Sequence, residues 1–292
     1  MEKAGAGGRK RGPAPRGPAI FDDHLARWGL APDGDPIITR SSRLLPVRRE
    51  GAPAMLKIAT AAEERRGGLL MVWWDGQGAA RVLAHAGAAL LMERAAGGAS
   101  LVEMARNGRD DEASRIICAV AARLHAPRDR APPEPVPLSR WFEELAPTAA
   151  RHGGVLEQAA ATARELLAAP QDVVTLHGDI HHGNILDFGD RGWLAIDPKG
   201  LAGERGFDFA NIFRNPDPQT ATAPGRLARQ ASVVAEAAAL ERARLLKWVL
   251  ACAGLSAAWI LGAGEKPELD LAVAERAAAE LAPGSHRKGR PR

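Results

Sequence analysis

The sequence predicts an α+β fold with two lobes: a small N-terminal antiparallel β-sheet lobe with one helix, and a larger, mainly helical C-terminal lobe. Three observations support this prediction. Strand-like segments and turn residues are concentrated between residues 37 and 93 and are interrupted by one helical segment. The apolar spacing becomes helical after residue 95. The chain has 292 residues, which is long enough for one large domain or two lobes.

The N-terminal lobe is expected to cover residues 20–95. After a short first helix, its elements are predicted in the order β, β, β, α, β, β. In sequence they are a helix at 22–28, an extended segment at 37–39, strands at 42–48 and 53–59 joined by a turn at Glu50-Gly51, a helix at 61–72, and strands at 80–84 and 88–93.

The C-terminal lobe is expected to cover residues 96–285, with the boundary between the lobes near residues 95–98. Asp110 and Asp111 predict the N-cap of a helix with an apolar face. Five prolines between residues 127 and 137 predict an irregular connection. Further helices are expected at 141–145, at 156–169 and along the alanine-rich stretch 226–281.

The charge of the chain is distributed unevenly. A formal charge of +4 and a pI of about 9.4 suggest a nucleic-acid or acidic-membrane partner. However, residues 1–19, which read as a disordered tail, and the basic tail 286–292 each have a net charge of +4, whereas residues 20–285 have a net charge of −4. A mildly acidic body suits a cationic partner better than a phosphate backbone, so no nucleic-acid partner is expected.

Composition excludes several other classes of protein. Hydrophobic residues make up 46% and charged residues 25%, which is normal for a globular chain. The two cysteines, Cys118 and Cys252, lie far apart and predict no disulfide scaffold, so a reducing, cytoplasmic location is expected. The N-terminus has no apolar signal-peptide core. The uncharged run 248–264 predicts a buried helix, and we expect a monomer with no membrane partner.

Residues 173–200, VVTLHGDIHHGNILDFGDRGWLAIDPKG, contain the residues for which the sequence predicts a chemical role. Two strand-like pieces flank the turn residues 189–192, which predicts a hairpin. If the turn is symmetric about its middle two residues, Asn184 lies opposite Asp197. An amide oxygen and a carboxylate at one point suit Mg²⁺, which completes its shell with phosphate oxygens. Asp179 lies on the preceding loop, where it could orient and deprotonate a hydroxyl.

This pattern resembles the kinase catalytic loop H-x-D-x-x-x-x-N followed by a metal-binding Asp, here His177-Gly178-Asp179, Asn184 and Asp197. The glycine of HGD resembles the aminoglycoside and choline kinase branch of that superfamily. Further stretches resemble the aminoglycoside 6-phosphotransferases, the family of streptomycin 6-kinases and hydroxyurea-resistance kinases. They are SSRLLPV (41–47), AMLKI (54–58), WWDGQGAARVL (73–83) and GFDFANIFRNP (206–216). The resemblance implies a protein-kinase-like fold.

The resemblance also implies roles for individual residues. Lys57 would hold the ATP phosphates and Glu64 would be its helical partner, with Glu63 as the neighbouring candidate. Asp179 would be the catalytic base, while Asn184 and Asp197 would hold Mg²⁺. Backbone groups of Glu93 and Ala95 would contact the adenine, and Asp208 would brace the catalytic loop; the loop with Ser41 and Ser42 would contact the phosphates.

The chain departs from the kinase pattern in two places. Residues 39–42 (TRSS) stand where protein kinases have a glycine-rich loop, and there is no A-P-E motif, which favours a small-molecule kinase. The histidines at 177, 181 and 182 could suggest zinc, but hydrogen bonding for His177 and surface positions for the other two are expected. For Glu143, Glu144 and Glu204, contact with a cationic substrate and a solvated position are equally compatible with the sequence.

The function expected from the resemblance is ATP- and Mg²⁺-dependent phosphorylation of an aminoglycoside, a small cationic substrate, at the 6-hydroxyl of streptomycin, which would confer resistance. A kinase of hydroxyurea, of another aminoglycoside or of another small hydroxylated substrate is an alternative. A nucleotide-binding pseudokinase module is a second alternative, although all four residues of the Lys57, Asp179, Asn184 and Asp197 set are present. A nucleic-acid-binding protein that uses the basic ends is a third.

Overall fold

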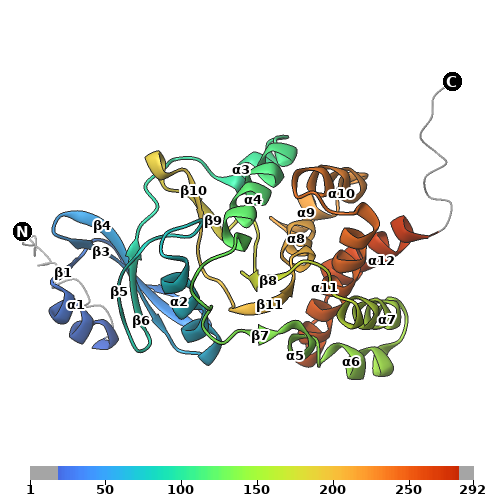
Figure 1. The fold of residues 1–292 in the computed structure, drawn as a ribbon, viewed down its shortest axis with the longest axis horizontal. Helices are drawn as coiled ribbons and strands as arrows, with labels where there is room; N and C mark the ends of the chain where they lie inside the picture. Colours follow the sequence, from blue (N-terminus) through green and yellow to red (C-terminus); the bar gives the residue numbers. More distant parts are fainter. Residues whose placement is uncertain (1–18, 283–292) are drawn as a thin grey trace, which may run out of the picture.

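The computed structural model describes residues 19–282, which form a sheet part and a helical part joined by residues 94–100. The sheet part lies at the left of Figure 1 and the helices of the C-terminal half lie at the right. The expected α+β fold is therefore confirmed. The predicted boundary at 95–98 falls in the joining segment. The predicted tails 1–19 and 286–292 lie outside the described residues, apart from Ala19.

The sheet part contains a six-stranded sheet in which every neighbouring pair is antiparallel. The strand order is β1-β3-β4-β6-β5, with β2 paired to β3. The strands are β1 (Leu30–Pro32), β2 (Ile37–Ile38), β3 (Ser42–Arg49), β4 (Ala52–Ala59), β5 (Val82–Ala86) and β6 (Ala89–Glu93). Four strands precede the helix instead of the three expected, because β1 is a short edge strand that ends in proline.

The predicted turn at Glu50-Gly51 is confirmed. Both residues have a positive φ, 53° and 82°, and Arg49 pairs with Ala52. Two successive left-handed residues match the right-handed twist of the flanking strands, which explains the glycine at this position.

Two helices cover opposite faces of the sheet. The segment that begins with η1 (Ala19–Phe21) and α1 (Asp22–Trp28) packs on one face against residues such as Leu45, Leu56 and Leu91. Helix α2 (Ala62–Trp74) packs on the other face, where Leu90 and Met92 belong to the larger core. Successive residues of β4 and β6 therefore alternate between the two cores.

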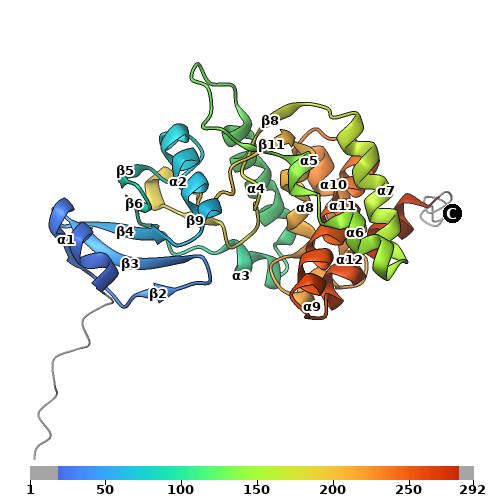
Figure 2. The ribbon, with the colours of Figure 1, turned by 90° about the horizontal axis from the view of Figure 1, so that it is seen from below.

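The helical part is built around the long apolar helix α11 (Arg242–Gly262), which packs against α7, α8 and α12. Figure 2 shows these helices side by side, away from the sheet. The helices are α3 (Leu101–Arg106), α4 (Asp110–His125), α5 (Leu138–Trp141), α6 (Leu145–His152), α7 (Val155–Ala168), α8 (Gly206–Ala210), η3 (Asn211–Arg214), α9 (Pro218–Ala221), α10 (Arg226–Ala237), α11 and α12 (Glu268–Leu281). The helix expected at 141–145 is wrong, because a turn separates α5 from α6 there.

Helix α11 passes a length and hydropathy test for a membrane span, with a mean hydropathy of 1.7 over its most apolar window. However, 67% of that window is buried inside the protein. The expectation of a buried helix for the run 248–264 is confirmed for residues 248–258, whereas Trp259 is 40% exposed and the rest of the run is not buried.

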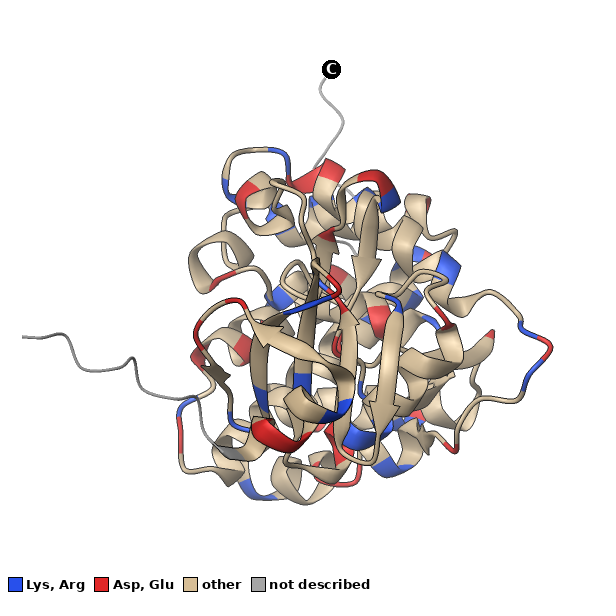
Figure 3. Cartoon of the chain, turned by 90° about the vertical axis from the view of Figure 1, so that its left-hand side faces the viewer, with Lys and Arg blue, Asp and Glu red and all other residues tan. Residues whose placement is uncertain are grey.

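Helix α4 begins differently from the prediction. Its N-cap residue is Arg109, and no side chain caps it. Asp110 is instead buried and receives two hydrogen bonds from Arg226 of α10, at 2.7 and 3.0 Å. Its carboxylate therefore joins two helices and does not cap one. Elsewhere, Lys and Arg are interspersed with Asp and Glu over the face drawn in Figure 3.

Two small sheets lie between the two parts. One is β7 (Val136–Pro137), β11 (Leu201–Glu204) and β8 (Val173–Leu176), and the other is the hairpin of β9 (Ile185–Asp187) and β10 (Trp193–Ala195), which turns through η2 (Gly189–Arg191). Ala195 exchanges hydrogen bonds of 2.9 Å with Gly78 and Ala80, the segment that follows α2. The hairpin is therefore attached to the sheet part through its last strand.

Candidate active site

The loop between β8 and β9 is held by a buried carboxylate from α8. Asp208 is 1% exposed, and it accepts hydrogen bonds from the backbone N–H groups of His177 at 2.9 Å and Gly178 at 2.7 Å. His125 of α4 lies 2.8 Å from the same carboxylate. The bracing contact expected of Asp208 is present, and it holds the loop at the entry to the site.

His177 is a structural residue of this loop. Its Nε2 lies 2.8 Å from the carbonyl oxygen of Ile196, and its Nδ1 accepts from the backbone N–H of Asp179 at 3.2 Å. The proton is therefore on Nε2. Complete burial lowers the pKa of His177, which agrees with the neutral ring that these two contacts require. The neighbouring His182 is also buried, which corrects the surface position expected for it, whereas His181 is partly exposed.

Asp179 is the most directly positioned acid of the site. Asn184 donates from Nδ2 to the Asp179 backbone carbonyl at 2.9 Å and to Oδ2 at 3.3 Å. Asn211 donates to the other oxygen, Oδ1, at 2.8 Å. The side chain is still 29% exposed. A carboxylate fixed in this way and open on one side could accept the proton of a bound hydroxyl.

The hairpin register differs from the prediction by one residue. Ile185 pairs with Ala195, and Asn184 accepts a hydrogen bond of 2.9 Å from the backbone of Ile196 and is not opposite Asp197. The symmetric two-residue turn was wrong, because η2 makes the loop one residue longer than that turn requires. Asp197 follows the strand with a φ of 63°, a left-handed conformation that is unusual for a non-glycine residue.

These two residues offer oxygen ligands to a cation. The Asn184 amide uses Nδ2 toward Asp179, which leaves Oδ1 as the available atom. Burial opposes the charge of Asp197, but Lys57 and then Lys199 hold the pKa of its carboxyl below the ordinary value. No group of three His, Cys, Asp or Glu side chains that could hold a metal occurs among residues 19–282. An ion here would need phosphate or water oxygens as well, which fits Mg²⁺.

Lys57 of β4 forms an ion pair with Glu64 of α2 and a second with Asp197. Lys57 and Glu64 are 8% and 4% exposed, so both charges are buried and compensated. The choice of Glu64 over Glu63 agrees with this geometry, since Glu63 lies 3.4 Å from Lys199. The alternation along β4 explains the arrangement, because Leu56 and Ile58 face the α1 core and Lys57 faces α2.

The other predicted nucleotide contacts make different interactions. Ser41 donates to Glu64 at 3.1 Å, whereas Ser42 is buried and hydrogen-bonds to Thr39 within the turn before β3. Glu93 ends β6, and its backbone N–H already donates to Arg81 at 3.0 Å, so only its carbonyl remains for an adenine. Ala95 follows in the joining segment. These four residues remain predictions as nucleotide contacts.

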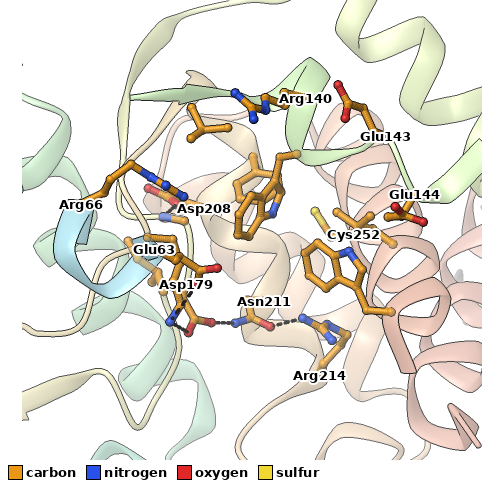
Figure 4. A pocket seen from close by; sticks show the side chains of 18 residues that line it. Glu63, Arg66, Arg140, Glu143, Glu144, Asp179, Asp208, Asn211, Arg214 and Cys252 are labelled. Carbon is orange, nitrogen blue, oxygen red and sulfur yellow. Dashed lines mark hydrogen bonds and ion pairs between the residues drawn. The ribbon is translucent and has the colours of Figure 1, made fainter. Parts of the chain in front are cut away.

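A cavity of about 580 Å³ opens beside Asp179. Figure 4 shows Asp179 and Asn211 on one side of it, with Glu143 and Glu144 across from them. Trp141 and Trp259 line the same wall with their rings edge to face, 5.3 Å between centroids. Glu204 does not reach this cavity. Burial opposes its charge, but hydrogen bonds from Arg244 and Trp248 hold its pKa below the usual value, so it is structural.

A family model named aminoglycoside/hydroxyurea antibiotic resistance kinase matches residues 27–264. The chain belongs to this family. It is 54% identical over 258 residues to a streptomycin 3''-kinase of Klebsiella pneumoniae, a match that covers 85% of this chain and 97% of that protein. It is 31% identical over 260 residues to a streptomycin 6-kinase of Streptomyces griseus, which covers 80% of each.

The fold of the chain is similar to that of a solved structure. The structure of an aminoglycoside phosphotransferase, APH(3'')-Id of Streptomyces rimosus, in complex with ADP and streptomycin, matches with a TM-score of 0.55 and 20% identity. The match covers 82% of this chain and 96% of that one. The expected protein-kinase-like fold is therefore confirmed.

Three further residues contact the site, and the local sequence pattern predicts no role for them: Lys199, Asn211 and Arg214. Lys199 lies 3.8 Å from Asp179 and 3.1 Å from Glu64. Burial opposes its charge, but Asp197, Asp179 and the two glutamates raise the pKa of Lys199. Asn211 holds Asp179, and Arg214 in turn donates to Asn211 at 2.6 Å. Asn211 and Arg214 both belong to the stretch GFDFANIFRNP, which resembles the family, but only the tertiary structure shows their contacts.

Proposed function

We propose that this chain transfers the γ-phosphoryl group of ATP to a hydroxyl of streptomycin. The observation that supports this most directly is the arrangement of Asp179 at the edge of a 580 Å³ cavity, beside Asn184 and Asp197. The cavity is lined by both acidic and basic side chains. On the wall across from Asp179, Glu143 and Glu144 form no ion pair within residues 19–282, and together with Trp141 and Trp259 they suit a cation that carries guanidinium groups. The 54% identity with a streptomycin 3''-kinase over nearly all of that protein supports the same substrate.

Each of these residues has a different proposed role in the reaction. Lys57 would hold the phosphate oxygens of ATP. Because its ion pair with Glu64 already fixes the side chain, little side-chain entropy is lost when the phosphates bind. Asn184 and Asp197 would hold Mg²⁺, which when bound supplies charge neutralisation to the phosphates. Asp179 would orient the substrate hydroxyl toward the γ-phosphorus and take its proton, with both of its oxygens already fixed by neighbours.

The hydroxyl that is modified is the finer part of the proposal. The resemblance alone suggested the 6-hydroxyl. Identity of 54% with the 3''-kinase, against 31% with the Streptomyces griseus 6-kinase, favours the 3''-hydroxyl. We therefore place the 3''-hydroxyl first and keep the 6-hydroxyl as the second candidate. The two hydroxyls are on different rings of the drug, so the product identifies which is correct.

The test is mass spectrometry of the drug after incubation of the purified chain with ATP, Mg²⁺ and streptomycin. A mass gain of one phosphoryl group is expected. Fragmentation that separates the streptidine ring from the aminosugar should place the phosphate on the aminosugar; a phosphate on streptidine would select the 6-hydroxyl. Asp179→Asn should lower turnover by about 10²–10⁴-fold. No phosphate on the drug would refute the proposed substrate.

A panel of other substrates separates the alternatives. Phosphorylation of hydroxyurea or of another aminoglycoside, and not of streptomycin, would support a related kinase. A pseudokinase would bind nucleotide without transferring phosphate to any member of the panel. The monomeric state, the cytoplasmic location and the absence of a nucleic-acid partner remain predictions, which size-exclusion chromatography, cell fractionation and an RNA-binding assay would test.

A further inference from the structure

Lys199 connects the nucleotide side of the site to Asp179, the proposed catalytic base. It follows Asp197 by two residues, and its Nζ donates to Glu64 Oε1 at 3.1 Å. Glu63 Oε1 and Asp179 Oδ2 lie at 3.4 and 3.8 Å from the same nitrogen. The side chain is 17% exposed. An ammonium group thus lies between the carboxylate that orients Lys57 and the carboxylate that faces the substrate.

The ion pairs form one continuous series of alternating charge. Asp197 pairs with Lys57, Lys57 with Glu64, Glu64 with Lys199, and Lys199 with Asp179. Glu64 therefore holds two lysines, one on each of its oxygens. The series runs from the proposed metal ligand to the proposed base, so it connects the two groups between which the phosphoryl group is transferred.

The two lysines face different spaces. Lys57 and Asp197 line a small cavity between the sheet and α2, whereas Lys199 and Asp179 line the large cavity. The ammonium of Lys199 has three N–H donors, of which one is used in the hydrogen bond to Glu64. Donors therefore remain for an oxygen atom placed between Asp179 and the nucleotide.

We propose that Lys199 is a catalytic residue, whose ammonium group contacts the transferring phosphoryl group from the acceptor side while Lys57 holds the phosphates from the nucleotide side. This inference rests on the proposed phosphotransferase function. In the step, the acceptor hydroxyl oxygen forms a bond to the γ-phosphorus and the bond from that phosphorus to the bridging oxygen breaks. ADP leaves with the electron pair, and the hydroxyl proton passes to Asp179. Lys199 stabilises the phosphoryl oxygens during the transfer.

The experiment compares Lys199→Met, Lys199→Arg and a control, Lys266→Met, an exposed lysine with no ion pair in the described structure. Two quantities are measured: kcat for phosphorylation of streptomycin, and the affinities for ADP with and without aluminium fluoride, which mimics the transferring phosphoryl group. Lys199→Met should lower kcat by about 10²–10³-fold. It should weaken ADP–aluminium fluoride by a similar factor while ADP affinity changes less than about threefold. Arginine should restore part of both, because it keeps the charge.

Two results would overturn the proposal. Unchanged kcat and unchanged ADP–aluminium fluoride affinity in Lys199→Met would show that the ammonium contacts no transferring group. An equal loss of ADP and ADP–aluminium fluoride affinity would show that Lys199 only orders Glu64. The fluoride measurement requires no acceptor. If the native chain fails to phosphorylate streptomycin but Lys199→Met selectively weakens the fluoride complex, the proposed substrate is wrong and the role of Lys199 stands.

Discussion

Asn211 donates a hydrogen bond of 2.8 Å to Oδ1 of Asp179, and a second hydrogen bond, from Arg214, fixes the orientation of the Asn211 amide. Arg214 donates to the Asn211 oxygen at 2.6 Å and to Asp270 of α12 at 2.5 Å. The oxygen of the amide must therefore face Arg214, and the nitrogen must face Asp179. The last described helix thus helps to orient an acid that is distant in sequence.

We expect Asn211→Ala to lower kcat about tenfold while KM for ATP changes little, because misplacing a reacting group by a fraction of an ångström slows the chemical step more than binding. Asn211→Asp should be slower still, since it places a second carboxylate against Asp179. Steady-state kinetics and thermal melting measure the effect, with the exposed Asn107→Ala as the control. A loss confined to melting temperature would contradict a positioning role.

Adjacent glycines in α2 provide a matched test of helix placement. A Cβ at Gly67 would lie 2.0 Å from the carbonyl oxygen of Pro198, whereas a Cβ at Gly68 meets nothing within 4 Å. Gly67→Ala should push α2 away from the Asp197 segment, cost about 1–3 kcal/mol and reduce activity. Gly68→Ala should be fully active and more stable by up to about 1 kcal/mol. Equal behaviour of the two variants in denaturation and turnover would refute the close packing.

Two glutamates in the cavity wall, Glu143 and Glu144, should contribute to substrate affinity. Glu143 and Glu144 are exposed and form no ion pair within the described chain. We expect the double change of Glu143 and Glu144 to glutamine to raise KM for streptomycin about 3- to 10-fold, because two exposed ion pairs with the drug would be lost. KM for ATP should not change. The effect should shrink at high salt. Glu157→Gln on the remote face of α7 is the control, and an equal effect there would mean that only the overall charge matters.

The buried pair of Asp110 and Arg226 should make stability depend on pH. Burial opposes the charge of Asp110, but nearby His182 and the hydrogen bonds from Arg226 lower its pKa to about 2. The folded pKa is below the unfolded value of 3.8, so this contribution is complete above pH 3.8 and is lost as the pH falls toward 2.

Asp110→Asn should therefore lower the free energy of unfolding by about 3 kcal/mol at pH 7, because Arg226 is left without its counter-charge. The difference from the native chain should diminish between pH 3.8 and 2. Urea titrations across this range measure it, with Asp190→Asn in the exposed η2 turn as the control. A difference that is independent of pH would show that the charge of Asp110 contributes nothing.

Much of the site could be predicted because its residues are close together in the chain. Asp179, Asn184 and Asp197 belong to one loop and hairpin, and the local spacing was sufficient to group them. Their detailed pairing was not predictable, since a single extra residue in the turn shifts the register and moves Asn184 opposite Ile196.

The sequence does not predict which acidic residues line the cavity and which form structural ion pairs. Glu143 and Glu144 line the cavity, but Glu204 has the same charge and is held by Arg244 and Trp248. Asp110 looked like a helix cap and instead pairs with a residue of α10. Each of these outcomes depends on which partner the fold places nearby, and no local pattern contains that information.

The sequence by itself determined the two-part α+β fold, the buried helix α11, the segment that carries the candidate catalytic residues and the acidic body between basic ends, because periodicity, turn residues and short motifs are local properties of a chain. Only the tertiary structure decided which charges meet. Lys57 and Asp197 are 140 residues apart, and Glu64 and Lys199 are 135 apart. Contacts of this kind form when β4, α2 and the hairpin pack together, since the energy of an ion pair depends on distance in space and burial, and not on separation along the chain.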